Sequence, residues 1–350
     1  MSLDQILLAQ GSGGRLSHDL VVSLFLRHFE NPILQQLDDS AVVELPIGWS
    51  KPAAPIDLRP RLALSTDSYV ISPLVFPGGD IGKLAVCGTV NDLSMSGARP
   101  LWLSAGFIIE EGLPLSILEQ IVASMAVTAK EAGVQIVTGD TKVVDRGSAD
   151  KLFINTAGVG MVPHDVTIAG DQAQPGDVIL LNGTIGDHGM TIMTLREGLQ
   201  FASPLESDCA PLNGLVADLL AALPAGSIRC LRDPTRGGLA TALNELATSS
   251  QVGIEIEEAA LPVREPVRAA CELLGLDPLY VANEGKLVVI VAKEAADAAL
   301  ATLRAHRYGR EATIVGYVTE SHVGRVALRT SLGARRIVDM LVGEQLPRIC

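Results

Sequence analysis

The stretch GGDIGKLAVCGTVNDLSMSGARPLWLSAGFII, residues 78–109, predicts a bend, a helix and a strand in direct succession. Gly78 and Gly79 supply the tight bend, because glycine adopts backbone conformations that other residues avoid. A helix is expected from 80 to 97, and the apolar run 102–109 is expected to be a buried strand. The mixture of helices and short strands indicates an α/β or α+β fold.

The same mixture continues on both sides of this stretch. Upstream, apolar residues at helical spacing follow a Gly/Ser turn, and residues 61–66 form a candidate strand that runs into Asp67. Downstream, Ser116 and Glu119 form a capping box for a helix that Gly133 ends. Further strands are expected at 134–138, 152–159, 178–181, 252–256 and 287–292, and further helices around 239–246 and 294–306.

Two domains and a tail are expected, because 350 residues exceed the usual size of one domain. The composition turns polar at 172–177, so we place an N-terminal domain at 1–170 and a C-terminal α/β domain at 171–341. Residues 342–350 show no periodicity and are expected to form a mobile tail. Four prolines between 45 and 60 predict an exposed loop there.

Composition and charge limit the kind of protein. The chain carries 40 acidic and 27 basic side chains, a formal charge of −13, and 48% of its residues are hydrophobic. The hydrophobic content excludes general disorder, and the acidic balance disfavours nucleic acid and anionic membranes as partners. The first residues predict no signal peptide, and no apolar run reaches the roughly 18 residues of a membrane span. A cytoplasmic protein is therefore expected.

The five cysteines predict neither a disulfide framework nor a zinc site, because they are dispersed, odd in number and free of CxxC spacing. Cys350 differs from the others, because it is the last residue and lies on the predicted mobile tail. Pro347 stiffens the approach to it, and Arg348 can offset the nearby terminal carboxylate that disfavours a thiolate. A carrier of a covalent group, a metal-delivery thiol and an accident all remain open for it. Three others are expected to be small core residues: Cys87, Cys230 and Cys271.

Aspartates recur after apolar runs, at the ends of predicted elements. They are Asp38, Asp39, Asp67, Asp92 and Asp140, each close to Gly, Thr, Ser or Asn. Carboxylate oxygens suit Mg²⁺, which keeps some of its waters and leaves positions for phosphate oxygens. Aspartate at such places also caps helices and forms turns. Taken singly, each residue allows both interpretations.

Three other features could contact an anion or a substrate. The GSGG stretch at 11–14 offers backbone N–H groups before a helix, although its spacing is neither a Walker loop nor GxGxxG and a plain turn is the alternative. Lys83 and Lys142 are candidates for phosphate pairing, or are simply solvated. Glu284 precedes a predicted strand and is either a placed base or a turn residue.

Together these stretches resemble the HypE family of carbamoyl dehydratases, in the superfamily of aminoimidazole ribonucleotide synthetase and selenophosphate synthetase. The resemblance covers essentially the whole chain, and the tail motif separates this family from its ATP-using relatives. It is carried by GSGG at 11–14, DDSA at 38–41, STDSY at 65–69, FPGGDIGKL at 76–84, GTVND at 88–92, VTGDTK at 137–142, GTIGDHG at 183–189, DPTRGG at 233–238, ANEGK at 282–286 and PRIC at 347–350.

The resemblance implies a two-domain α/β (α+β) fold of the aminoimidazole ribonucleotide synthetase type. Its N-terminal domain would bind ATP and form a homodimer, and its tail would be flexible. It implies ATP and Mg²⁺ as cofactors. The implied metal ligands are Asp39, Asp67, Asp92 and Asp140. The implied ATP contacts are Gly11, Ser12, Gly13, Gly14, Asp67, Lys83, Asn91, Asp92, Thr138, Gly139 and Asp140. The implied catalytic residues are Cys350, Lys142, Glu284 and Arg348.

The resemblance also implies the reaction and its partners. A HypF-type carbamoyltransferase would load the Cys350 thiol, and ATP-dependent dehydration would turn the carbamoyl group into a thiocyanate. The cyanide would then pass to the iron on a HypC–HypD scaffold during [NiFe]-hydrogenase maturation. Glu284 is the expected base, and His188 is the alternative, which otherwise is a structural side chain in a turn. Two rival functions are another ATP-dependent enzyme of the superfamily acting on a free small substrate, and a nucleotide-binding scaffold.

Overall fold

The computed structural model describes residues 10, 14–29, 31–44, 60–199, 201, 204–341 and 348–350. Gly11, Ser12 and Gly13 lie outside the described residues, and so does the predicted loop at 45–60 apart from Pro60. Within the described part, no helix combines the length and the apolar character that crossing a membrane requires.

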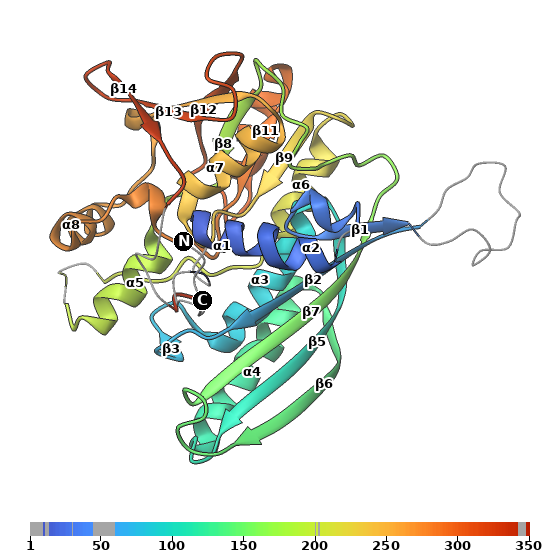
Figure 1. The fold of residues 1–350 in the computed structure, drawn as a ribbon, viewed down its shortest axis with the longest axis vertical. Helices are drawn as coiled ribbons and strands as arrows, with labels where there is room; N and C mark the ends of the chain where they lie inside the picture. The colour runs from blue at the N-terminus through green and yellow to red at the C-terminus, as the bar shows by residue number, and fades with distance from the viewer. Residues whose placement is uncertain are drawn as a thin grey trace, which may run out of the picture.

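The first half of the chain builds a sheet covered by helices on one face (Figure 1). Its strand order is β1-β2-β7-β5-β6, and β6 is an edge strand that pairs parallel with β5. The strands are β1 Ala41–Glu44, β2 Arg61–Tyr69, β5 Arg99–Glu110, β6 Gln135–Val144 and β7 Leu152–Val162. The covering helices are α3 Ile81–Met95 and α4 Leu115–Ala132, and β3 Val75–Phe76 pairs with β4 Gly79–Asp80 just before α3.

Helix α3 begins as the stretch 78–109 predicts. The Asp80 carboxylate accepts hydrogen bonds from the backbone N–H groups of Gly82 and Lys83, at 2.8 and 2.9 Å, and so caps the helix. Nearly all of α3 is buried between the sheet, α4 and the second domain. This helix therefore carries Asp92 into the middle of the molecule.

Two local predictions for this domain are wrong. Helix α4 begins after Pro114 without a side-chain cap, so Ser116 and Glu119 form no capping box, although Gly133 does end the helix with a φ of 70°. The strand predicted at 102–109 forms within β5, but it is not buried throughout, because 48% of Trp102 is exposed on the uncovered face of the sheet. On that face Trp102 lines a cavity of the described structure and is not packed beneath a helix as the residues of the opposite face are.

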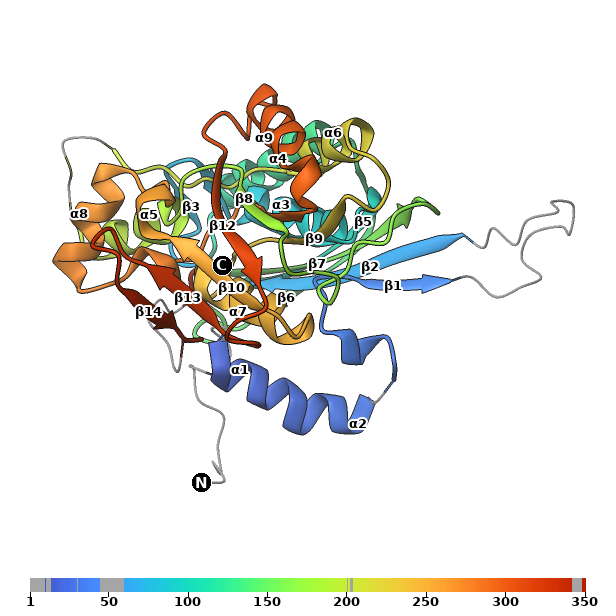
Figure 2. The same ribbon diagram turned by 90° about the horizontal axis from the view of Figure 1, so that it is seen from above.

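An N-terminal helical segment stands away from this sheet (Figure 2). It comprises α1 Gly14–Leu20, a π-helical stretch η2 Val21–Leu26, and α2 Arg27–Phe29, followed by the 3₁₀ turn η3 Leu34–Gln36. The helical periodicity predicted for this segment is therefore confirmed. Its apolar residues are nonetheless largely exposed, with 63% of the Phe29 side chain in solvent.

The second half of the chain builds a mixed sheet in the order β14-β13-β10-β12-β8-β11-β9. The strands β8 and β11 are apolar runs buried along their whole length, as expected for central strands. The strands are β8 Val178–Leu181, β9 Ile228–Arg232, β10 Gly253–Glu257, β11 Val288–Val291, β12 Thr313–Thr319, β13 Val326–Arg329 and β14 Arg335–Val338. The helices are α5 Asp187–Arg196, α6 Asn213–Ala222, α7 Gly238–Ser249, α8 Glu265–Leu274 and α9 Ala296–Ala305, with 3₁₀ turns η4 Glu258–Ala260, η5 Pro278–Tyr280 and η6 Lys293–Ala295.

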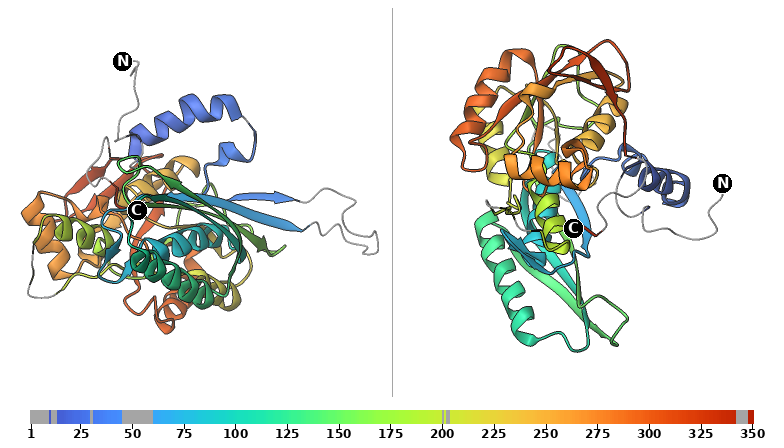
Figure 3. Two further views of the ribbon diagram at one scale, coloured as in Figure 1. Left: turned by 90° about the horizontal axis from the view of Figure 1, so that it is seen from below. Right: turned by 90° about the vertical axis from the view of Figure 1, so that its left-hand side faces the viewer.

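The two sheets lie one above the other, with α3 packed on α6 between them (Figure 3). The described residues at the end of the chain, 348–350, lie in the middle of the molecule, beside β3 and α5 (Figure 1). The Ile349 side chain is 3% exposed and belongs to the apolar core beneath α3. The predicted mobility of residues 342–350 stays a prediction, because one arrangement does not test movement and 342–347 lie outside the described residues.

Candidate active site

An acidic cavity lies where the two domains meet. Its volume is about 150 Å³. Carboxylates from both halves of the chain line it together with Cys350. The lining residues are Asp39, Asp67, Ser68, Tyr69, Gly88, Asp92, Asp233, Thr235, Arg236, Glu284 and Cys350.

Each carboxylate reaches the cavity from a different element. Asp39 precedes β1, Asp67 lies in β2, Asp92 lies in α3, and Asp233 follows β9 directly. The Ser65 hydroxyl donates to the Asp92 carboxylate at 2.6 Å. Three of the four predicted metal ligands are therefore close together in the fold, although they are distant in sequence.

Asp39 is held by an arginine of the other domain. The Arg232 Nη1 lies 3.0 Å from Asp39 Oδ1, and the same guanidinium also pairs with Glu245. Burial raises the pKa of Asp39 well above its usual range, and the attraction of Arg232 opposes that shift. Asp39 and Glu245 in turn raise the pKa of Arg232 above its usual range, against the effect of burial, so this arginine is always charged.

Crowding of carboxylates destabilises their charged forms in the cavity. The pKa of Asp92 lies well above its usual range, because the residue is buried and because Asp67, Asp233 and Asp39 repel its charge. Burial raises the pKa of Asp233 to about 7, against the pull of Arg232. The Asp233 Oδ2 atom is buried and has no hydrogen-bond partner. A cation placed here would relieve both the repulsion and the missing contact.

The donor set fits Mg²⁺ in part. The aspartates offer the oxygen ligands that this ion requires, beside the sulfur of Cys350, and one or two carboxylates are enough because Mg²⁺ also binds waters and phosphates. Among the described residues, no three side chains of the usual ligand types converge into a complete metal cage. Phosphate oxygens are therefore needed to complete the coordination, so the site suits a metal–nucleotide complex better than a bare ion.

Two larger cavities share lining residues with the acidic cavity, and Asp39 lines all three. One, of about 720 Å³, lies along the sheet beside Asp67, Trp102 and Thr138. The other, of about 470 Å³, lies between α1 and α7 beside Gly14 and Asp233. A nucleotide bound in either would have its phosphates near the aspartates.

Glu284 extends its carboxylate into the acidic cavity. Its own backbone is fixed, because its N–H donates to Asp208 Oδ1 at 3.1 Å and its carbonyl accepts from Asn91 Nδ2 at 3.3 Å. Gly285 is required next to it, since a Cβ there would lie 1.9 Å from the Asp208 carbonyl oxygen. Glu284 Oε1 has no partner, and burial raises the pKa of this carboxyl well above its usual range. A desolvated carboxylate of this kind is a strong base.

Cys350 faces the same cavity. Its carbonyl oxygen accepts from the Val70 N–H at 3.1 Å. Burial raises the pKa of its thiol to about 12, although Arg236 lowers that pKa by attraction. The thiol is therefore protonated in this position and would be a poor nucleophile.

The expectation that Arg348 offsets charge beside the thiol is wrong for this arrangement. Its guanidinium pairs with Asp150, at 2.7 Å, and donates to the Val70 carbonyl at 2.9 Å. It does not line the acidic cavity. The residue anchors the tail instead.

His188 is a poor candidate for the base, because both of its ring nitrogens are occupied. Nδ1 lies 2.7 Å from the Ser207 hydroxyl, and Nε2 lies 2.8 Å from the Ile349 carbonyl oxygen. The ring is fully buried, and it does not line the acidic cavity.

The remaining predicted site residues of the VTGDTK stretch are not brought to the cavity. Asp140 and Lys142 pair with each other at 2.6 Å on the edge strand β6, with 70% and 68% of their side chains exposed. In the pairing of β6 with β5, Asp140 lies opposite Gly106 and Lys142 lies opposite Ile108, on the uncovered face of the sheet. Gly139 lines none of the three cavities, whereas Thr138 lines the larger cavity beside Asp67.

Lys83 and Asn91, which the resemblance implies as ATP contacts, do not line the acidic cavity. The Lys83 ammonium donates to the Gly78 carbonyl at 2.8 Å and lies in a separate polar cavity with Lys286 and Asp208. Asn91 is 1% exposed, and its side chain amide joins the domains by donating to the carbonyls of Ala210 and Glu284. It lines none of the three cavities around the aspartates, so its predicted contact with a nucleotide stays a prediction.

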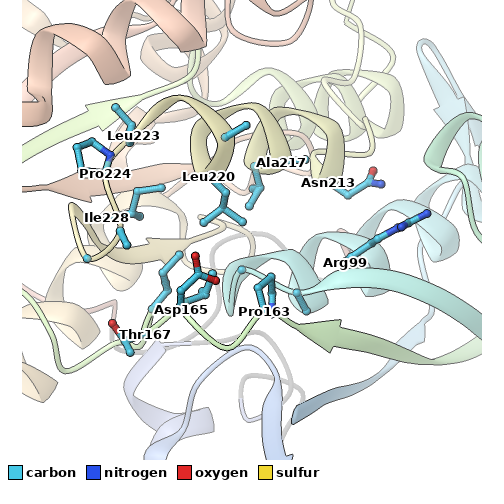
Figure 4. Close-up of a pocket in the computed structure, with 18 of the residues that line it drawn as sticks. Arg99, Pro163, Asp165, Thr167, Asn213, Ala217, Leu220, Leu223, Pro224 and Ile228 are labelled. Atoms are coloured by element: carbon cyan, nitrogen blue, oxygen red, sulfur yellow. The ribbon is translucent and has the colours of Figure 1, made fainter. Parts of the chain in front are cut away.

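Other features lie apart from this site. Cys87, Cys230 and Cys271 are buried, as predicted for core residues, and Cys209 is buried as well. A groove of about 530 Å³ lies between α6 and the start of β5, and Figure 4 shows Leu220, Leu223 and Pro224 lining it. None of the predicted site residues lines this groove.

Several residues that build the site are not among the functional residues predicted from the sequence. Asp233 and Arg236 belong to the DPTRGG stretch, and Arg232 precedes it, whereas Tyr69 ends β2. The Tyr69 hydroxyl donates to Asp67 at 3.1 Å. An acid, an arginine and two glycines directly after an apolar strand are a recognisable signal for a strand-end site.

Comparison with known proteins identifies the family of this fold. Residues 37–162 match the N-terminal domain family of AIR synthase related proteins, and residues 174–329 match the corresponding C-terminal domain family. The chain therefore belongs to the AIR synthase related family, and the predicted two-domain fold is confirmed.

Relatives at high identity define the branch of that family. The carbamoyl dehydratase HypE of Azotobacter vinelandii is 57% identical over 343 residues, which are 98% of this chain and 96% of that protein. HypE of Escherichia coli K12 is 50% identical over 348 residues, 99% of this chain and 100% of that protein. A solved HypE–ATP complex has a TM-score of 0.80 and 55% identity, covering 99% of this chain and 100% of that one. A solved HypE–HypF complex has a TM-score of 0.84 and 49% identity, covering 92% and 99%. These likenesses confirm the resemblance to the HypE carbamoyl dehydratases.

Proposed function

We infer that this chain is an ATP-dependent carbamoyl dehydratase that acts on a carbamoyl group carried by its own Cys350. The observation that carries the inference is the position of the Cys350 thiol in one cavity with Glu284 and the aspartates. The high identity to carbamoyl dehydratases and the likeness to an ATP-bound relative support it. The role that follows is cyanide synthesis for hydrogenase maturation.

The chemistry follows from the poor leaving ability of an amide oxygen. The carbamoyl oxygen on Cys350 attacks the γ-phosphorus of ATP, and ADP leaves. The oxygen then departs with the phosphate, both N–H protons are lost, and S–C≡N remains on the cysteine. In sum, one carbamoyl group and one ATP give one thiocyanate, ADP and phosphate.

Glu284 is the base that this arrangement favours. Its unpartnered Oε1 and the Cys350 side chain line the same small cavity, so an N–H group on the sulfur comes within its reach. Arg236 lines the cavity as well and is the charge that acts most strongly on the thiol. Water has little room beside them, which protects the reactive group from hydrolysis.

We propose that Asp39, Asp67, Asp92 and Asp233 hold Mg²⁺ together with the phosphates of ATP. The metal would supply positive charge for the transferring phosphoryl group. The buried, mutually repelling carboxylates support this assignment. The position of Gly14 supports the predicted phosphate contact of the GSGG stretch, because Gly14 and Asp233 line the same cavity.

We propose that two copies of the N-terminal domain form a homodimer through the uncovered face of the sheet. Apolar side chains are exposed on that face, including Leu64, Trp102 and Met161. Asp140 and Lys142 stand on the same face. In a dimer they would contact the nucleotide of the partner subunit, which accounts for their distance from the acidic cavity of their own chain.

We further propose two partner classes for this chain. A HypF-type carbamoyltransferase would load Cys350, and the solved HypE–HypF complex of a relative supports that choice. A HypC–HypD iron scaffold would receive the cyanide. Loading would require the thiol to leave the cavity, because in the docked position Cys350 is only partly exposed and its raised pKa keeps the thiol protonated.

The deciding experiment is the intact mass of the carbamoylated protein before and after MgATP. We expect the loss of one water, located on the peptide that contains Cys350, together with one phosphate released per chain. Glu284→Gln should keep its carbamoyl group after MgATP, while Glu206→Gln, an exposed neighbour outside the cavity, should react normally. An unchanged mass in the wild-type protein would contradict the dehydratase assignment and favour a scaffold. Full product formation by Cys350→Ala would favour an enzyme acting on a free substrate.

A further inference from the structure

We propose that His188 is a positioning residue for Cys350: its Nε2–H holds the Ile349 carbonyl and thereby sets the thiol in the acidic cavity. The Nε2 to oxygen distance is 2.8 Å. The inference goes beyond the proposed function, because it concerns how the reacting group is placed, and it uses that function only for the second arm of its test.

The hydrogen bonds around the ring fix which nitrogen carries the proton. The Ser207 oxygen accepts from the Cys209 N–H at 3.1 Å, so its own proton is available to donate to His188 Nδ1. Nδ1 is then the acceptor, and Nε2 carries the hydrogen. Burial lowers the pKa of His188, which keeps the ring neutral in this tautomer. Nε2–H therefore donates to the Ile349 carbonyl, which can only accept.

The ring has little freedom to turn. It lies in the first turn of α5, is 0% exposed, and meets the Phe76 ring edge-on at a centroid distance of 5.5 Å. A donor held in this way defines the position of its acceptor closely. His188 is thus a rigid buried contact for the end of the chain.

Consecutive residues of the tail are held by different domains. His188, from the second domain, holds the Ile349 carbonyl, and Val70, from the first domain, donates to the Cys350 carbonyl at 3.1 Å. Ile349 also inserts its side chain into the core. With these groups fixed on both sides, Cys350 is held where it lines the same cavity as Glu284.

The outer contacts of the tail are weaker constraints. Arg348 and Asp150 form an ion pair whose side chains are 32% and 41% exposed, and such partly solvated pairs contribute little. Arg196 donates to the Arg348 carbonyl from a half-buried position. The buried contact to His188 is therefore the one whose loss should release the thiol most.

The test uses two matched substitutions in the full-length protein. In His188→Gln the side-chain amide can reach the position of Nε2 and donate to Ile349, whereas in His188→Asn it reaches only the position of Nδ1. The readout is the rate at which iodoacetamide alkylates Cys350 in the absence of ATP and carbamoyl phosphate. This rate is measured from the increase in mass of the C-terminal peptide. This rate reports the fraction of chains in which the thiol is undocked.

We expect His188→Asn to alkylate about tenfold faster than the wild type, as the loss of one buried hydrogen bond implies, and His188→Gln to stay within about threefold of it. Equal rates in the wild type and His188→Asn would overturn the proposal, and so would an equal acceleration in both variants. If His188→Asn does not fold, Ser207→Ala takes its place, because it removes the donor that fixes the tautomer. An unchanged rate in that variant would also overturn the proposal.

The second arm separates this proposal from the proposed function. Single-turnover dehydration by carbamoylated His188→Asn should be slower, with an unchanged KM for ATP, because no residue of the aspartate cluster is altered. If the wild type fails to dehydrate, the proposed function fails, but the alkylation result still decides the role of His188. A slower reaction caused only by a raised KM for ATP would count against positioning.

Discussion

Arg232 and Asp39 form an ion pair between the two domains, with 3.0 Å between Nη1 and Oδ1, at the point where three cavities meet. Asp39 precedes the first strand of one sheet, and Arg232 ends the outermost strand of the other. Only 11% of the Arg232 side chain and 16% of the Asp39 side chain are exposed. The pair therefore connects the stability of the domain arrangement to the placement of a metal ligand.

Arg232→Met should destabilise the protein by roughly 3 kcal/mol, because it leaves the largely buried Asp39 carboxylate and the partly buried Glu245 carboxylate without their counter-ion. Urea unfolding at pH 7.5 measures this loss. Arg335→Met is the control, since Arg335 pairs with Glu255 at an exposed position and should cost less than about 1 kcal/mol. Equal costs for the two substitutions would contradict the importance of the buried pair.

Asp233→Asn should stabilise the protein at neutral pH while weakening MgATP binding. The pKa of Asp233 is raised to about 7 in the folded protein, above the value of about 3.9 in an unfolded chain. The folded state therefore holds the extra proton between these values, and the wild type loses stability as the pH rises from 4 to 7.

Urea unfolding at pH 4.5 and pH 7.5 checks the sign of this effect. The variant and the wild type should be nearly equal at the lower pH, and the variant should be more stable by about 1–3 kcal/mol at the higher pH. Asp145→Asn, at an exposed turn, should show no such divergence. A stability loss in Asp233→Asn at pH 7.5 would show that the charged form is favoured in the cavity.

Mixed dimers test whether Lys142 serves the partner subunit. Lys142→Met and Cys350→Ala proteins should each be inactive alone. If Lys142 acts across the dimer, a mixture should regain activity, because the intact Cys350 of one chain meets the intact Lys142 of the other. The measurement is the dehydration activity after the subunits have exchanged. At that point about half of the dimers in the mixture should be heterodimers. No recovery despite heterodimer formation would place Lys142 in the site of its own chain.

Gly88→Ala should disturb the cavity wall through Tyr69. A Cβ at position 88 would lie 2.2 Å from the Tyr69 hydroxyl oxygen, the group that donates to Asp67. We expect a cost of about 1–3 kcal/mol. Tyr69→Phe removes the clashing atom and leaves a nearest contact of 3.1 Å, so the same alanine should cost clearly less in that background. A double-mutant cycle by urea unfolding measures the coupling, and additive costs would contradict it.

Much of the fold could be predicted from local sequence. The helix at 80–97, the strand entering Asp67 and the apolar strands at 178–181 and 287–292 all form, because each has the periodicity or the turn residues that a helix or strand requires. The capping box at Ser116 failed, because Pro114 already starts the helix. The exposure of Trp102 was not predictable, because an apolar run does not reveal which face of a sheet lacks a cover.

The sequence by itself determined the chemical groups: the scattered aspartates, Glu284, and a thiol at the last position of the chain. Only the tertiary structure decided which of them meet. It joins Asp39, Asp67 and Asp92 with Asp233 and Cys350, and it leaves Asp140 and Lys142 on an exposed edge strand. It also converts His188 from a candidate base into a buried contact for Ile349. The reason is physical: strand register and domain packing set these distances, and no local pattern of residues encodes contacts between segments that lie more than a hundred positions apart.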